Sequence, residues 1–149
     1  MKLDKISIKG FKSIRDLELD LSPLNVLIGA NGAGKSNFIG VFRLLNEMVE
    51  GENRFQNAIT RGGGAETFLH FGRKVTEKIE IELRFGKNGY YCAWAPTADG
   101  TLFFEKEDKM DKDDDALLEA AAIFVGRYKE AAQLFQASGP ARQSLEAKI

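Results

Sequence analysis

Eight residues near the N-terminus, GANGAGKS at positions 29–36, constrain this chain more than any other feature of its sequence. They match the phosphate-binding pattern G-x-x-x-x-G-K-[ST] at every fixed position. The pattern needs a strand before it and a helix after it. An apolar run over 24–28 predicts a buried strand. A helix over 36–50 is predicted by apolar residues that recur at helical spacing, namely Phe38, Val41, Phe42, Leu45, Met48 and Val49.

The residue types of the loop have a chemical reason. Glycines allow positive φ and a close approach of the backbone to a ligand, so successive N–H groups can form an anion-binding nest at the start of a helix. Lys35 can neutralise the β- and γ-phosphates of a nucleotide, and the Ser36 hydroxyl can coordinate Mg²⁺. The alternative is a glycine-rich turn that binds nothing. The predicted binding residues are Gly29, Ala30, Asn31, Gly32, Ala33, Gly34, Lys35, Ser36 and Asn37.

Length and composition set the broad class. The 149 residues are enough for one domain with a real core, and the 44% hydrophobic and 29% charged content is ordinary for a soluble protein. A net charge of −1 gives no argument for binding nucleic acid or a membrane surface. The single cysteine, Cys92, excludes an internal disulfide framework. We find no signal peptide and no apolar run that could span a bilayer, which predicts a cytoplasmic protein.

Strands are predicted on both sides of the loop. Residues 3–9 and 15–21 read as two strands with a polar face, and alternation over 75–85 predicts the clearest strand of the second half. Asn88 and Gly89 are a hairpin signal, so a meander is expected over 75–105. Between the helix and this meander, residues 51–66 are expected to form an irregular surface loop. His70, the only histidine, is expected to be packed or on the surface.

Two features of the meander could mislead. Residues 101–105, TLFFE, resemble an apolar Walker B strand that ends in an acid, but no crossover helix precedes them, so Glu105 is interpreted as a solvated strand end. Tyr90, Tyr91 and Trp94 could stack on bases, although alternation favours core packing for them.

Residues 105–115 are a charge run interpreted as a solvated linker. A helix is predicted over 116–137, stopped by Gly139 and Pro140.

Three segments, 8–14 (IKGFKSI), 24–28 (LNVLI) and 29–37, together resemble the N-terminal part of ABC-type ATPase heads. The branch is that of RecF, the SMC proteins and the related OLD-like, "AAA family" predicted ATPases. The resemblance is most specific over 3–45 and continues loosely through 61–64 and 69–72. It implies a P-loop NTPase that binds ATP with Mg²⁺, with the first strand and its turn beside the adenine. That placement makes Lys12 a candidate nucleotide-binding residue on the adenine side.

The fold class expected from these observations is α/β, in the sense of a mixed α+β protein. It is an ABC-ATPase-like N-terminal lobe of a P-loop NTPase, with an antiparallel meander and a C-terminal helix. The ATP-binding lobe is expected over 1–108, and an acidic linker and helix over 109–149. An exposed sheet edge would favour self-association.

The ATPase motifs that we do not find in the sequence limit the expected function. No Walker B acid, signature motif or catalytic residue is identified, so we expect a portion of a longer ATPase that binds ATP and turns over little alone. The family would couple ATP to a partner, such as a second ATPase half, in DNA repair or phage defence. DNA is a conceivable partner that the net charge does not support. Two alternatives stay open: a non-catalytic or DNA-associated module with a relict loop, and a small phosphotransferase or GTPase.

Overall fold

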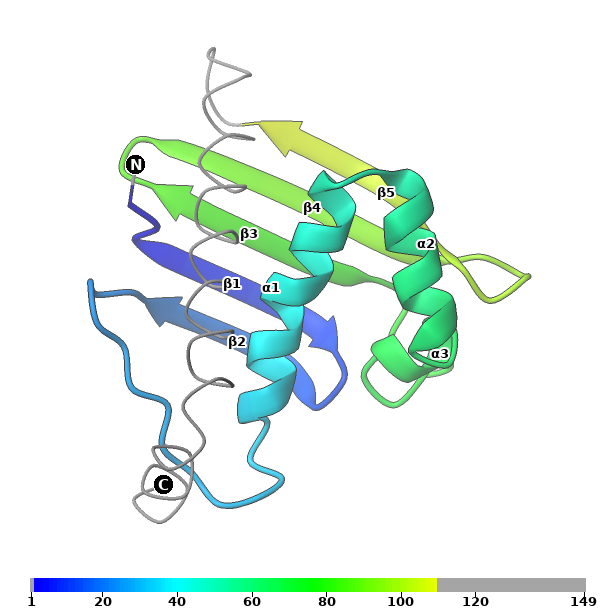
Figure 1. The fold of residues 1–149 in the computed structure, drawn as a ribbon, viewed down its shortest axis with the longest axis horizontal. Coiled ribbons are helices and arrows are strands. Elements are labelled where there is room, and N and C mark those ends of the chain that lie inside the picture. Colours follow the sequence, from blue (N-terminus) through cyan, green and yellow to red (C-terminus); the bar gives the residue numbers. More distant parts are fainter. Residues whose placement is uncertain (1, 110–149) are drawn as a thin grey trace.

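A computed structural model describes residues 2–109 of the protein. The helix predicted over 116–137 and the acidic residues after 109 lie outside the described residues. The described part contains five strands and three helices in the order β1, β2, α1, α2, α3, β3, β4, β5. Figure 1 shows a single sheet with the three helices on one of its faces. This is the mixed α+β arrangement expected from the sequence.

The five strands form one antiparallel sheet in the order β2-β1-β3-β4-β5. Each neighbouring pair is antiparallel, including β1 with β3, which lie far apart in the sequence. The sheet therefore joins the two strands before the phosphate-binding pattern to the meander after it. The strand bounds are Lys5–Phe11 (β1), Ile14–Asp20 (β2), Ile79–Phe85 (β3), Asn88–Pro96 (β4) and Leu102–Lys109 (β5).

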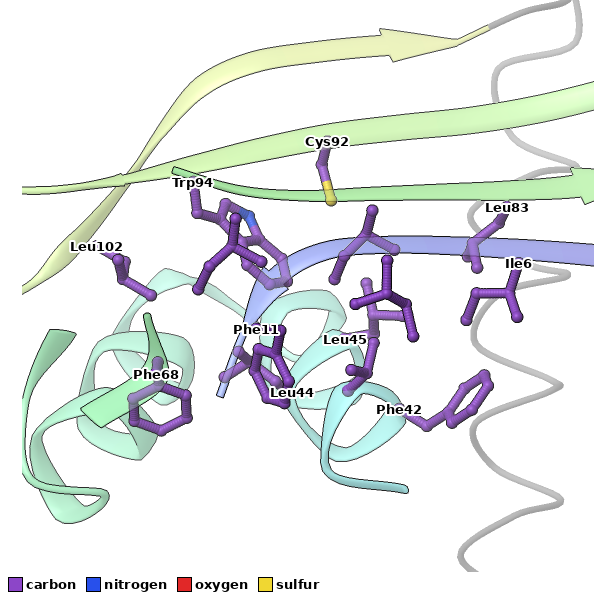
Figure 2. Close-up of a cluster of buried hydrophobic side chains, with 14 of the residues drawn as sticks. Ile6, Phe11, Phe42, Leu44, Leu45, Phe68, Leu83, Cys92, Trp94 and Leu102 are labelled. Carbon is purple, nitrogen blue, oxygen red and sulfur yellow. The ribbon is translucent and has the colours of Figure 1, made fainter. Parts of the chain in front are cut away.

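Alternation along β3 explains why the sheet has one buried face. Ile79, Ile81, Leu83 and Phe85 are buried beneath the helices. The residues between them are charged and only partly buried, because they lie on the opposite face. On β4, Tyr90 and Trp94 are buried in the same core, which confirms the prediction for these two residues. For Tyr91 the prediction is wrong, because its side chain is half-buried and its hydroxyl donates to Glu80 Oε1 at 2.6 Å. Figure 2 shows side chains of the sheet and of α1 converging on this core, with Ile6, Leu83 and Trp94 opposite Leu44 and Leu45.

The β3–β4 hairpin turns two residues earlier than predicted. Phe85 pairs with Asn88, so the turn consists of Gly86 and Lys87, and the predicted turn residues Asn88 and Gly89 belong to β4. Gly86 adopts φ +62°, which suits the first position of a tight hairpin turn. The observed register pairs the buried Ile79 with the buried Trp94. Core packing thus decided between two turn signals that are adjacent in the sequence.

The prediction of an irregular loop over 51–66 is wrong. Helix α2 (Glu52–Arg61) and the short α3 (Ala65–Phe68) occupy most of it, after α1 (Lys35–Val49). Phe55 and Ile59 of α2 lie one helical turn apart and are completely buried, so burial of this stripe outweighs the polar composition. Within 2–109, no helix is long and apolar enough to cross a membrane.

The charge run was also interpreted wrongly in its first part. Residues 105–109 belong to β5, and 106–109 pair with β4, with Lys109 opposite Tyr90 and Asp108 opposite Tyr91, whereas Glu105 lies at a register shift and has no partner residue on β4. Backbone hydrogen bonds to a neighbouring strand satisfy this segment whatever its side chains, so charge alone did not make it a linker. Charged side chains on an edge strand are also a common protection against unwanted pairing.

The strand predicted over 24–28 is not formed. Leu24, Val26 and Ile28 are 81%, 69% and 74% exposed, and no strand among the described residues pairs with them. Ser22 N–H donates to Asn25 Oδ1 at 2.9 Å, and Asn25 Nδ2 donates back to the Ser22 carbonyl at 2.6 Å. These local bonds favour a turn over an extended ladder. An apolar run becomes a buried strand only where neighbouring strands supply partners for its backbone.

Candidate functional site

The phosphate-binding pattern forms a loop that leads directly into α1. Gly32 and Gly34 adopt φ +85° and +90°, a region that residues with a β-carbon rarely adopt. Gly34 is the N-cap of α1 and provides no side-chain cap. The first N–H groups of a helix have no partner within the helix, so here they are left to an external acceptor. An anion is the natural acceptor at such a helix start.

The side chain of Lys35 is folded back across the loop. Its Nζ donates hydrogen bonds to the carbonyl oxygens of Gly29 and Ala30, the latter at 2.8 Å. The loop is further closed by Ala33 N–H, which donates to the same Ala30 carbonyl at 3.1 Å. These contacts hold the ammonium group against the loop that leads into α1, and the start of that helix favours negative charge.

The loop surrounds a polar hollow of about 400 Å³. Six of the nine predicted binding residues line it, and two others, Gly29 and Ala30, hold the Lys35 ammonium group. The ninth, Ala33, closes the loop through its backbone. These nine residues are consecutive in the sequence, and the tenth predicted binding residue, Lys12, does not line the hollow. The lining residues are Asn31, Gly32, Gly34, Lys35, Ser36 and Asn37.

The donors at the hollow fit a nucleotide phosphate with Mg²⁺. A lysine and a helix start suit the phosphates, and the Ser36 hydroxyl is a ligand of the hard oxygen type that Mg²⁺ prefers. The residues lining the hollow include no carboxylate. Over residues 2–109, no group of three or more His, Cys, Asp or Glu side chains could hold a metal without a ligand's help. Phosphate oxygens and water would therefore complete the coordination around Ser36.

Lys12 lies close to this loop, but its side chain is directed elsewhere. It occupies the turn between β1 and β2 with φ +50°, and its Nζ lies 4.7 Å from the centroid of the Phe68 ring. The neighbouring Ser13, which sequence reasoning did not single out, is the residue of this turn that faces the loop. Ser13 Oγ accepts a hydrogen bond of 2.7 Å from Asn37 Nδ2. No local pattern signals this contact, because 24 residues separate its partners.

His70 has a structural role, as predicted, and helps to hold this turn. Its N–H donates to the Gly10 carbonyl at 3.0 Å, and its Nδ1 lies 2.7 Å from the Lys12 carbonyl. Lys12 N–H in turn donates to the Phe68 carbonyl at 2.8 Å. The β1–β2 turn is therefore tied to residues 68–70 as well as to its own strands.

Two titratable residues of the meander take no part in the site. Glu105 is exposed and forms an ion pair of 3.2 Å with Lys78, which confirms its predicted solvation, but it lies inside the edge strand β5 and not at a strand end. Its strand is antiparallel to β4, whereas a Walker B strand would be parallel to its neighbour. Cys92 is completely buried, and burial raises the pKa of its thiol, so it is not a reactive nucleophile.

An apolar hollow of about 320 Å³ adjoins the loop on the side of β2. It shares Gly34 and Lys35 with the polar hollow and is lined by aliphatic and aromatic residues together with Ser13, Arg15 and Asp16. Part of this lining comes from the unpaired segment before the loop. The apolar lining residues are Ile14, Leu17, Leu19, Leu27, Ile28 and Phe38.

Comparison with known proteins agrees with this geometry. A sequence model of the AAA ATPase domain matches residues 1–138. The chromosome partition protein Smc of Methanocaldococcus jannaschii is 30% identical over 74% of this chain and 11% of its own length. The DNA double-strand break repair Rad50 ATPase of Saccharolobus solfataricus is 34% identical over 54% of this chain and 10% of its own length.

A third relative and a solved structure extend the comparison. The DNA replication and repair protein RecF of Aliivibrio fischeri is 33% identical over 59% of this chain and 24% of its own length. The chain thus spans between 10% and 24% of these three curated relatives. A solved SMC ATPase, from work on ATP-driven dimerization and DNA-stimulated activation, matches 83% of this chain and 80% of its own. Its TM-score is 0.51 at 19% identity, which shows a common fold.

Proposed function

Because this chain belongs to the AAA ATPase domain family, we propose that it binds Mg²⁺–ATP at the loop of residues 29–36. It would do so as the nucleotide-binding part of a larger ABC-type ATPase. The observation that carries the proposal is the position of Lys35, the first residue of α1, which lines a polar hollow and whose ammonium group bonds the carbonyls of the loop. A cation, free backbone donors and a hydroxyl at one point suit a polyphosphate.

The residues of the chain have distinct roles in this proposal. The first N–H groups of α1 donate to phosphate oxygens, and the glycines at 32 and 34 let the backbone come close enough. Lys35 exchanges its contacts with the loop carbonyls for contacts with the β- and γ-phosphates. Ser36 offers its hydroxyl to Mg²⁺, and the metal, when bound, would neutralise charge on the phosphates.

We further infer that the chain alone binds ATP without turning it over at an appreciable rate. Hydrolysis requires a group that orients the attacking water and, in this superfamily, an acid near the metal. The lining of the phosphate hollow supplies neither a carboxylate nor a histidine. These groups would come from another segment or another molecule.

The partner is proposed from the relatives. Smc, Rad50 and RecF are described by chromosome partition, double-strand break repair and DNA replication and repair. We place this protein in the same broad field of DNA maintenance, with self-association on ATP as the expected response. The net charge of −1 favours an indirect relation to DNA, through a partner, over a broad basic surface.

Isothermal titration calorimetry with ATP, ADP and GTP in Mg²⁺ tests the proposal on the full chain. We expect ATP to bind, and Lys35→Ala to weaken binding by at least 30-fold, about 2 kcal/mol for a lost charged contact. Lys87→Ala, in the β3–β4 turn, removes an equal charge away from the loop and is the matched control. Absence of nucleotide binding by the unmodified chain would contradict the proposal. Phosphate release by the unmodified chain, abolished in Lys35→Ala, would contradict the inference of low turnover.

A further inference from the structure

We propose that the hydrogen bond between Asn37 and Ser13 positions the phosphate-binding loop on the sheet. The two residues are thus positioning residues for whatever the loop binds. This inference rests on the proposed function, because it concerns the same loop. It adds a residue outside the binding pattern, Ser13, and a specific task for the residue that follows the pattern, Asn37.

The bond connects two separate parts of the fold. Asn37 lies in the first turn of α1 and lines the polar hollow. Its Nδ2 reaches Ser13 Oγ, 2.7 Å away, in the turn between β1 and β2. The Asn37 side chain therefore lies at the polar hollow and is also hydrogen-bonded to the turn between β1 and β2.

Ser13 contacts the loop at a second point. A β-carbon placed on Gly34 would lie 3.0 Å from Ser13 Oγ, so the hydroxyl oxygen rests against the backbone of this glycine. Gly34 is the N-cap of α1 with φ +90° and is the residue whose conformation begins the helix. Ser13 thus touches the helix start at its cap and at its first turn.

The turn that carries Ser13 is well anchored. Phe11 and Ile14, on either side of the turn, form the last pair of the β1–β2 ladder. Backbone bonds from Lys12 to Phe68, and the contact of His70 Nδ1 with the Lys12 carbonyl, hold the turn from the other side. A residue fixed by two strands and a helix can serve as a reference point for its neighbours.

The loop itself has weak support elsewhere. The segment before it, 24–28, is exposed and pairs with no described strand. The buried face of α1 begins at Val41, and Phe38 in the first turn is only partly buried. The end of α1 next to the loop therefore depends on Ser13 more than the middle of the helix does.

Two phosphate ligands distinguish positioning of the loop from recognition of the base or sugar. A contact that positions the loop should matter equally for Mg²⁺–ATP and for inorganic tripolyphosphate, which lacks base and sugar. Loss of one ordinary hydrogen bond predicts a Kd about fivefold higher for each ligand in Ser13→Ala and in Asn37→Ala. Ser13→Thr keeps the hydroxyl and should keep affinity within a factor of about two.

The experiment is calorimetric titration of the full chain with both ligands, for these variants and for the double variant Ser13→Ala/Asn37→Ala. Because the two residues share one bond, the double variant should bind about as tightly as either single variant. Ser22→Ala and Asn53→Ala replace an exposed serine and an exposed asparagine that line neither hollow at the loop, and they serve as controls. Circular dichroism melts verify that each variant is folded.

Each outcome decides the inference. Equal weakening toward both ligands, rescue by threonine and non-additivity would support it. Unchanged affinity in both single variants would overturn it and leave the proposed function intact. A loss limited to ATP would overturn it as well, because it would mean contact with the base or sugar. Multiplied losses in the double variant would show that the two residues act independently and would overturn the inference too. If the unmodified chain bound neither ligand, the proposed function would fail and this inference with it.

Discussion

Gly10 of β1 packs so closely against Lys78 that a β-carbon on Gly10 would lie 2.6 Å from the Lys78 carbonyl oxygen. The same β-carbon would lie 2.6 Å from Thr76 Cγ2, and Gly10 has φ +72°. This close approach brings the end of β1 against the segment that leads into β3. The β1–β2 turn comes directly after this point in the sequence, and its Ser13 contacts the phosphate-binding loop.

We expect Gly10→Ala to lower the free energy of unfolding by about 3 kcal/mol. Roughly 1 kcal/mol is the strain of positive φ, and the rest is overpacking against the backbone. Gly86→Ala is the matched control, because Gly86 also has positive φ but has open space where a β-carbon would lie. It should cost about 1 kcal/mol. Urea unfolding followed by far-UV circular dichroism gives both values, and equal costs would refute the close-packing argument.

Phe55 tests the helix that the sequence did not predict. Its ring is completely buried and lies 5.1 Å from the ring of Trp94, centroid to centroid. We expect Phe55→Ala to lower the free energy of unfolding by about 3–5 kcal/mol through lost burial and a cavity. Asn53→Ala, on the exposed part of α2, should change it by less than about 0.5 kcal/mol. A small effect at Phe55 in the same urea titration would mean that α2 does not pack on the sheet.

Glu66 predicts a dependence of stability on pH. Its carboxylate accepts the Arg73 N–H at 2.9 Å and pairs with the Arg73 guanidinium, and these contacts lower the Glu66 pKa below its ordinary value of 4.5. A lowered carboxyl pKa stabilises the fold above the unfolded-state pKa, and this contribution is lost as pH falls through the folded-state pKa.

We therefore expect the Tm of the unmodified chain to fall more steeply between pH 5 and about pH 3 than that of Glu66→Gln. The variant cannot lose a charge that it does not carry. Glu77→Gln removes another carboxylate, which has no hydrogen bond or ion pair among the described residues and only a longer-range attraction to Lys78, and it is the control. Parallel Tm curves for the unmodified chain and Glu66→Gln would argue against a folded-state role of the Glu66 contacts.

Glu105 provides a negative prediction. Because it lies on an edge strand and pairs with Lys78, Glu105→Gln should leave the Kd for Mg²⁺–ATP within a factor of about two of the unmodified value. The same calorimetric titration that tests Lys35 provides the measurement. A tenfold loss of affinity would place this carboxylate near the nucleotide and require a different arrangement of the site.

The parts of the fold that depend on local chemistry could be predicted from the sequence. The conformation of the loop follows from Gly32, Gly34 and Lys35 themselves. The strand predicted over 75–85 needs only one buried face, and its alternating part forms β3 over Ile79–Phe85, whereas Val75 is exposed. The position of the helix after the loop follows from its own spacing of apolar residues. For these segments, neighbouring residues contain the information.

The wrong or missing predictions concern segments whose structure depends on residues far away in the sequence. Phe55 and Ile59 make α2 stable only because Trp94 and the sheet cover them, and the polar residues between them gave the opposite signal. The run over 24–28 lacks a neighbouring strand among the described residues, which no local pattern could show. The bond from Asn37 to Ser13 joins residues 24 positions apart. Neither residue type predicts such a partner.

The burial of Trp94 gives the protein an optical property. It is the only tryptophan, its side chain is 0% exposed, and its indole N–H has no hydrogen-bond partner among the described residues. An indole in such dry surroundings emits at short wavelength, and emission shifts to the red when water reaches the ring. Trp94 lines neither hollow at the loop. Its fluorescence therefore reports whether the sheet and α2 are assembled, separately from occupation of the loop.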